Sequence, residues 1–410
     1  ERIEQNASGI AVYGPDGARV SIDDAKIDPG NARIYGVGIK DAGQGTYTVS
    51  WQVVSSDDGH FTKGAFVFSV GKETAGAAGL GQIQVQHITT VPQAGAIGVE
   101  LAGQAMILGV LVLFALIWRP LRRKFGNDSN AYEEIIRHRL TFLMIAGVGL
   151  VTIGVVLFIV LKTFDLQQLR SGGFYPTLQT FFSTVDGSWA VGRMVIAVVM
   201  LALFFVFRKD IFSSERITKK EIVLFILLCA ILFSRARVSH AAASHFYPFL
   251  SIVVNAVQLL FKELWVGGLI VSAAAIIPLL FRAKHIAHVV FFSTAFSKLL
   301  SVAFGLVGIT GAYIVWLHLK DPAYLLSTQW GARFIILSAF GGILFVIRLY
   351  HQFVLDKSAI AMCGGSTNHW AWQAVRWAPC TLSLEALVGV IVLFLTGFII
   401  ITTPPYVSES

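Results

Sequence analysis

Residues 55–64, SSDDGHFTKG, combine side chains that can bind a metal ion with residues that form turns. Asp58 and His60 flank Gly59, so a tight turn can direct a carboxylate and an imidazole toward one centre. These two groups suit Cu(II) or Zn(II). The same residues also fit an Asp-Gly hairpin turn beside a solvated histidine, so the spacing leaves both interpretations open.

A second candidate for metal binding is the segment SHAAASH at residues 239–245. His240 and His245 do not share one helical face at this separation, but they can converge in a loop. We predict that both bind metal; the alternative is that polar side chains are kept out of lipid. None of the ten histidines falls in the middle of an apolar segment, which argues against a bis-histidine haem inside a helical bundle.

Several polar residues interrupt the apolar segments. Asn255, Gln258 and Lys262 recur at i, i+3 and i+7 and therefore share one helical face, with Glu263 beside it. Because charge inside a membrane is costly, we predict that these four residues line a pathway. A structural Lys262–Glu263 ion pair is the alternative. Arg193, near the outer end of another apolar segment, is predicted to extend toward water.

The composition indicates a multi-pass membrane protein, because 55% of the 410 residues are hydrophobic and only 14% are charged. The net charge of +8 is expected from basic cytoplasmic loops and does not indicate nucleic-acid binding. The sequence contains no G-x-x-x-x-G-K-[ST] loop, so we expect no ATP-driven pumping. It also contains no recognisable hydrolytic triad, and we predict that the protein is not an enzyme.

The apolar pattern divides the chain into three parts. Residues 1–70 contain alternating runs such as GTYTVSWQVV and GAFVFSV, which predict a small all-β sandwich. The Gly/Ala-rich residues 71–96 are predicted to be a linker, and residues 97–405 a membrane domain. This all-α polytopic bundle is predicted to have about eight transmembrane helices, of which the fourth is short: 97–118, 140–161, 189–207, 221–236, 250–281, 289–317, 331–350 and 380–402.

Lys and Arg concentrate in alternate loops of this arrangement, those between the first and second, third and fourth, fifth and sixth, and seventh and eighth segments. Because cytoplasmic loops are enriched in these residues, the bias predicts that the β region and both termini lie outside the cytoplasm.

A resemblance to a known family supports the metal interpretation of residues 55–64. The strand motif Tyr47, Val49 and Trp51 is followed by a Ser-x-Asp-Gly-His turn and by a second strand; the later motif residues are Ser56, Asp58, Gly59, His60, Gly64, Phe66 and Phe68. Together they resemble the copper-resistance C domain, CopC. The resemblance implies an Ig-like or cupredoxin-like sandwich that binds Cu(II) outside the cytoplasm through Asp58 and His60. The family completes this site with a histidine at the mature N-terminus. No counterpart follows Glu1, so we expect an N-terminally incomplete domain or another donor.

The membrane region resembles the partner family, the copper-resistance D domain, CopD. The likeness rests on SHAAASH (239–245), ELWVGGL (263–269), FSKLL (296–300) and the closing TTPP (402–405). Fusion of both domains in one chain is a known arrangement of this family. Asn255 and Gln258 stand where the family often has an acidic residue and a histidine, and an amide is a poor ligand for Cu(I).

The resemblance therefore implies copper binding outside the cytoplasm and copper transport, in the direction of import, across the plasma membrane. The expected ions are Cu(II) in the outer domain and Cu(I) in the membrane, and periplasmic copper chaperones are candidate partners. The alternatives are a membrane-anchored copper-sequestration protein and, less favoured, a membrane redox protein.

Overall fold

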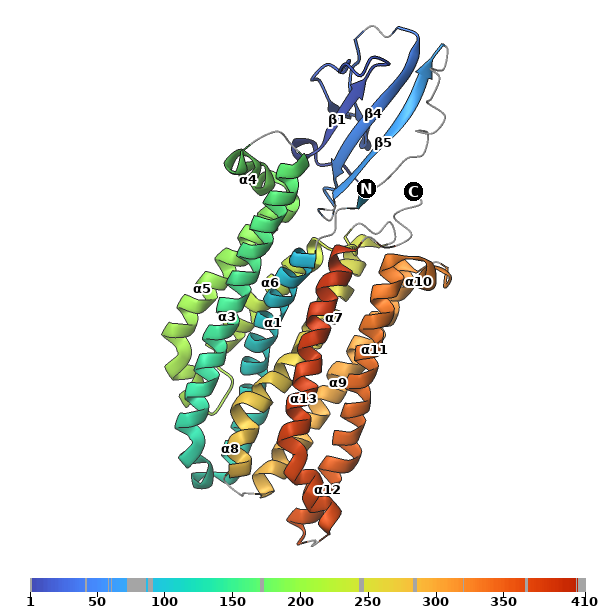
Figure 1. The fold of residues 1–410 in the computed structure, drawn as a ribbon. Coiled ribbons are helices and arrows are strands. Elements are labelled where there is room, and N and C mark those ends of the chain that lie inside the picture. Colours follow the sequence, from blue (N-terminus) through green and yellow to red (C-terminus); the bar gives the residue numbers. More distant parts are fainter. Residues whose placement is uncertain are drawn as a thin grey trace.

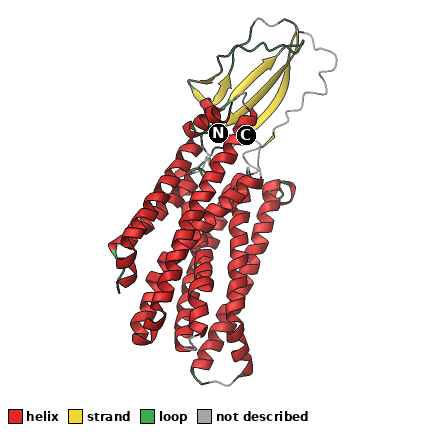
Figure 2. Cartoon of the chain, turned by 60° about the vertical axis from the view of Figure 1, so that its left-hand side comes forward, coloured by secondary structure: helices red, strands yellow, loops and turns green. Residues whose placement is uncertain are grey.

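The computed structural model describes residues 2–40, 43–57, 59, 61–71, 86–87, 91–169, 173–242, 247–282, 286–319, 321–365, 368–402 and 404. For residues 86–87, 127–131, 168–169 and 281–282 it describes only the backbone. Figure 1 shows a β domain standing on one end of a long helical bundle, and Figure 2 shows the same two parts from another side. The predicted fold class, a small all-β region followed by an all-α bundle, is confirmed.

The β domain contains two antiparallel sheets in the described residues. The larger sheet has the strand order β1-β4-β5-β6, and the smaller one pairs β2 with β3. Tyr47 and Val49 on β4 are buried with Val12 of β1, and the Tyr47 ring stacks on Phe68 of β5 with 5.3 Å between centroids. The predicted alternation therefore forms the domain's core. The strands are β1 (Gly9–Tyr13), β2 (Lys26–Asp28), β3 (Asn31–Gly36), β4 (Gly45–Val54), β5 (Phe61–Val70) and β6 (Gln86–His87).

The bundle is built from long helices that run between its two ends (Figure 1). Three five-residue π-helical turns, at Phe114–Trp118, Ser272–Ile276 and His351–Leu355, join helices end to end. The helices are α1 (Val91–Leu113), α2 (Arg119–Phe125), α3 (Asn127–Leu169), α4 (Phe174–Ser183), α5 (Val185–Ser213), α6 (Lys219–Arg237), α7 (Pro248–Val271), α8 (Ile277–Arg282), α9 (Ile286–His318), α10 (Tyr324–Ser327), α11 (Gln329–Tyr350), α12 (Asp356–Cys363) and α13 (His369–Ile401).

Seven helical stretches in the described residues are long and apolar enough to cross a membrane, where the sequence predicts eight. The remaining segment, 221–236, forms α6, whose ends are too rich in charge to meet that criterion: Lys219, Lys220, Glu221, Arg235 and Arg237. Its 19 residues span about 28 Å, close to the hydrocarbon thickness of a bilayer. It packs against α1, α5 and α7, and two of its charged residues, Glu221 and Arg235, are buried in ion pairs.

The predicted linker 71–96 overlaps regular structure at two places. Gln86–His87 forms β6 and pairs with β5, and α1 begins at Val91, six positions before the predicted helix start. The small residues that suggested a linker instead allow close helix contact. A Cβ on Gly397 of α13 would lie 2.3 Å from the Ala94 carbonyl oxygen.

Helix α1 forms the centre of the bundle, in contact with α3, α6, α7 and α13. Small residues let the backbones approach closely: a Cβ on Gly267 of α7 would lie 1.7 Å from the carbonyl oxygen of Ala105. Gly267 belongs to the Trp-x-Gly-Gly-Leu segment, so this motif has a packing role. The C-terminal end of α13 lies at the β-domain end of the bundle (Figure 1).

Candidate functional site

Three of the predicted metal ligands, Asp58, His60 and His245, lie outside the described residues. Their neighbours Asp57, Gly59 and Phe61 are described. Gly59 has a left-handed backbone (φ +74°), which favours glycine and forms the turn expected between the two ligands. The adjacent Asp57 accepts hydrogen bonds from Arg2, at 2.8 Å from the backbone nitrogen and 2.7 Å from Nε. The segment around Arg2 therefore lies beside Asp57.

The Gly59 turn rests directly on the bundle. Lys162 of α3 donates a hydrogen bond of 3.1 Å from Nζ to the Gly59 carbonyl, and Asp186 in the first turn of α5 lies 3.9 Å from the same ammonium. A Cβ on Gly59 would lie 2.7 Å from the Asp186 Cβ, so only glycine fits. Lys162 also lies over the Phe61 ring, 4.9 Å from its centroid. The β domain is thus fixed to the bundle by the turn that carries its predicted ligands.

A cavity of about 250 Å³ opens in the end of the bundle that carries the β domain. His240 and His318 both line it and are buried, with ring centroids 6.1 Å apart and ring planes at 82°. His318 ends α9, and Trp330 of α11 lies beside its ring. His318 is not among the predicted ligands, because only the packing of α9 brings it to His240; its position at the end of an apolar segment is the available signal.

The predicted polar face of α7 also lines this cavity. Asn255, Gln258 and Lys262 all contribute to its wall, as their spacing indicated. Asn255 Nδ2 donates to Ser239 Oγ at 2.8 Å, and Lys262 Nζ donates to Thr396 Oγ1 of α13 at 3.2 Å. The structure therefore brings His240 together with three of the four predicted pathway residues.

Glu263, the fourth predicted pathway residue, does not line the cavity. It is fully buried, and among the described residues neither of its carboxylate oxygens has a hydrogen-bond partner. Among the described residues, no ion pair within 4.0 Å joins Glu263 to Lys262. The predicted alternative of a direct Lys262–Glu263 pair is therefore not observed.

A buried charge network lies beside the cavity. Glu100 of α1 pairs with Arg193 of α5 at 3.1 Å and with Arg235 of α6, and it accepts a hydrogen bond of 2.9 Å from Gln104. The prediction that Arg193 extends toward water is wrong, because its side chain is fully buried against Glu100. Arg235 lines both the cavity that contains His240 and His318 and a smaller cavity of about 20 Å³ next to Phe61. It therefore lies between the β domain and the histidines.

Another buried polar pair lies toward the opposite end of the bundle. His351 Nδ1 lies 2.7 Å from Glu385 of α13, and His351 Nε2 lies 3.0 Å from Thr381 Oγ1. Both ring nitrogens are thus occupied. Within the described part of the chain, no cluster of three or more His, Cys, Asp or Glu side chains could hold a metal ion. His240 and His318 form a pair of buried imidazoles that share one cavity.

Comparison with known proteins agrees with the architecture. Residues 1–71 match the family model for the CopC domain. This part of the chain is a CopC domain. Over 278 residues, 66% of the chain, the sequence is 26% identical to Copper transport protein CutJ of Bacillus subtilis (strain 168). The match covers 47% of CutJ, so the chain spans about half the length of this relative.

No solved structure gives a significant match to the chain. A CopC domain followed by membrane-length helices is consistent with a CopC–CopD fusion. The comparisons therefore associate the protein with copper and with multi-pass membrane proteins.

Proposed function

We propose that this protein binds copper ions outside the cytoplasm and imports them across the plasma membrane. The observation that carries this proposal is the docking of the Gly59 turn on Lys162 and Asp186, at the end of the bundle where Arg235 connects this contact to the cavity of His240 and His318. Asp58 and His60 on that turn hold Cu(II) in the CopC domain, and Arg2 beside it indicates where a further donor reaches the ion. Periplasmic copper chaperones are the proposed donors of copper to this site.

His240 and His318 are the proposed copper ligands in the bundle. A metal bound to one nitrogen of each imidazole lies roughly 3 Å from each ring centroid, so centroids 6.1 Å apart leave room for one ion between them. Imidazole is a good copper ligand, whereas the Gln258 amide is not. His318 thus supplies the second imidazole, on α9 instead of α7.

Orientation gives the proposed direction. The basic loops favour a cytoplasmic location for the bundle end opposite the CopC domain, so an ion captured by this domain and passed through the bundle moves inward. Without a nucleotide-binding loop in the sequence, the movement is proposed to be passive or coupled to another ion.

Copper uptake into liposomes tests the proposal. The reconstituted full chain should load copper above empty liposomes, and the double substitution His240→Ala/His318→Ala should lower the rate by roughly tenfold or more. His369→Ala, which removes an exposed histidine from the opposite end, should leave uptake unchanged. Uptake no greater than in empty liposomes, with folding verified by gel filtration, would show that the protein is not a transporter.

Sequestration by a membrane-anchored CopC domain is the second candidate, and one observation favours it. Lys262 and Arg235 place two cationic groups on the wall of the cavity of His240 and His318, which raises the cost of bringing in a copper ion. If sequestration is correct, His60→Ala abolishes Cu(II) binding while the His240/His318 variant changes neither binding nor cellular copper content. Transport instead requires that the latter variant lose uptake while the CopC domain still binds Cu(II).

A further inference from the structure

A second sizeable cavity lies between α3 and α5, at the end of the bundle opposite the CopC domain. Its volume is about 640 Å³, and it has no role in the proposed copper path. No carboxylate lies among its lining residues. We call it the basic groove; its walls are formed by Arg137, His138, Thr141, Phe142 and Ile145 of α3 and by Arg208, Lys209, Phe212 and Ser213 of α5.

Three permanent cations converge on this groove from two helices. Arg137, Arg208 and Lys209 take part in no ion pair among the side chains that the structure describes. Two nearby carboxylates pair elsewhere: Glu133 with Arg122 at 2.5 Å, and Asp210 with Lys220. Glu134, one turn before Arg137, is exposed and does not line the groove. The lining of the groove therefore carries positive charge and no carboxylate.

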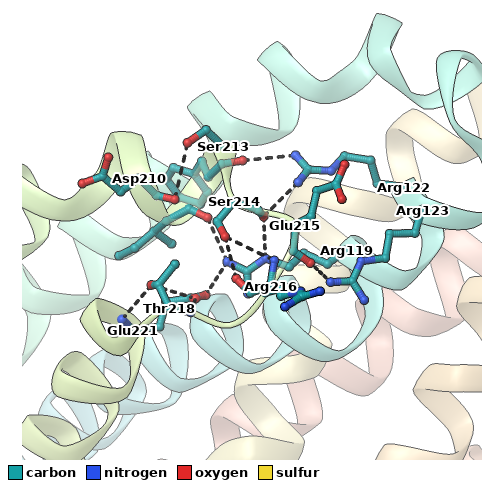
Figure 3. Close-up of polar contacts among 12 residues, drawn as sticks. Arg119, Arg122, Arg123, Asp210, Ser213, Ser214, Glu215, Arg216, Thr218 and Glu221 are labelled. Carbon is teal, nitrogen blue, oxygen red and sulfur yellow. Dashed lines mark hydrogen bonds and ion pairs between the residues drawn. The ribbon is translucent and has the colours of Figure 1, made fainter.

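The arginines of α2, close to the groove, differ from these three cations because their guanidinium groups are already hydrogen-bonded (Figure 3). Arg119 donates to the carbonyls of Ile211 at 2.8 Å and Ser214 at 3.0 Å, and Arg122 donates to Ser214 at 2.9 Å. These contacts satisfy carbonyls at the carboxyl end of α5 and fix the loop to α6. The cations of α5 itself are not needed there, so they remain available to a ligand.

An apolar surface continues from the cations toward the middle of the bundle. Phe142 follows the basic residues on α3 and is 68% exposed, and Ile145 lies next along the same wall. On α5, Val206 is 70% exposed. A free phosphate ion would use only the charged end of this surface, whereas a phospholipid uses both ends.

We infer that the basic groove binds an anionic phospholipid, with its phosphate on Arg137, Arg208 and Lys209 and an acyl chain along Phe142 and Ile145. Guanidinium groups match phosphate geometry through paired hydrogen bonds. Basic pockets between membrane helices recognise anionic head groups in this way.

Native mass spectrometry of the full chain in detergent tests this inference with phosphatidylglycerol, cardiolipin and phosphatidylcholine as probes. Anionic lipid should remain bound where phosphatidylcholine does not, and Arg137→Ala/Arg208→Ala should weaken its binding by roughly tenfold. Arg216→Ala/Lys219→Ala removes the same charge from exposed positions at the same end and should leave binding unchanged. Equal loss in both double variants, or equal retention of phosphatidylcholine, would overturn the inference.

Competition with inorganic phosphate distinguishes a phospholipid from a free phosphate ion as the ligand of the basic groove. If phosphate at equal concentration displaces the lipid or raises the thermal midpoint as much as the lipid does, the groove is an anion site and not a lipid site. Lys209→Gln serves as a further variant, because the Lys209 side chain is exposed. It should weaken anionic-lipid binding without changing the thermal midpoint of the lipid-free protein, and unchanged binding contradicts the proposed role of Lys209.

Discussion

Arg235 lines both cavities at the CopC-domain end of the bundle, and the Glu100 carboxylate on α1 pairs with its guanidinium. Glu100 also pairs with Arg193, and all three side chains are buried. One carboxylate therefore lies between two guanidinium groups. Loss of its charge leaves both cations without this counter-charge in the protein interior, which is more costly than the loss of an exposed pair.

We predict that Glu100→Gln lowers the free energy of unfolding by about 3–5 kcal/mol, because it removes one partner from buried ion pairs. Chemical denaturation of the detergent-solubilised protein measures this change. Glu134→Gln provides the control, since Glu134 is exposed near the N-terminal end of α3. Similar midpoints for the two variants would contradict the importance of the network.

Lys162 gives a second prediction at the residue scale. Lys162→Met keeps most of the apolar length of the side chain but removes the ammonium that donates to the Gly59 carbonyl. Copper uptake should fall several-fold while the Cu(II) affinity of the CopC domain, followed by electron paramagnetic resonance, stays the same. Lys26→Met on the exposed strand β2 is the matched control. An unchanged uptake rate in Lys162→Met argues against transfer through this contact.

Local spacing identified the residues that a single helix places together, such as Asn255, Gln258 and Lys262. It could not identify His318 or Glu100, because their partners lie 78 and 135 positions away in the chain. Such pairs depend on how the helices pack, and no periodicity within one segment encodes that packing. The same limit explains why Arg193 was interpreted as an exposed cation.

At the scale of elements, the contact between α1 and α7 depends on glycine. Gly267→Ala would place a Cβ 1.7 Å from the Ala105 carbonyl oxygen, so the helices must separate. We predict a loss of about 3 kcal/mol or more in the free energy of unfolding, at the upper end of overpacking effects. Thermal unfolding in detergent measures this loss.

Gly305→Ala on α9 is the control for this prediction, because a Cβ there meets no atom within 4 Å. Alanine is the better helix former, so this variant should be neutral or stabilising by up to about 1 kcal/mol. Equal stability of the two variants would show that the α1–α7 contact tolerates a methyl group.

Most elements could be predicted from periodicity, because alternating strands and long apolar helices differ in pattern as well as in length. The start of α1 was misplaced because glycine and alanine serve both flexible linkers and tight helix packing. Helix α6 illustrates the converse limit, since Arg235 and Glu221 reduce its apolar character while their buried partners compensate their charge.

At the scale of the whole molecule, orientation is testable with thiol chemistry. Cys363 is exposed and ends α12, at the end of the bundle opposite the CopC domain (Figure 1). In variants that retain a single cysteine, a membrane-impermeant maleimide added to intact cells with a permeable outer layer should label Ser50→Cys in β4. Cys363 should react only after the membrane is opened. The reverse labelling pattern would place the CopC domain inside the cell and contradict import.

If copper enters as proposed, the seating of Gly59 on Asp186 and Lys162 also has a consequence for the kinetics of entry. An ion passed directly from the docked CopC domain meets the bundle at the effective concentration of a tethered ligand, about millimolar for short connections, so the outside copper concentration acts only through the occupancy of that domain. The entry rate then saturates when the CopC domain is fully occupied, even if the cavity itself binds copper weakly. Weak binding in the cavity is an advantage in that regime, because it permits rapid release to the other side.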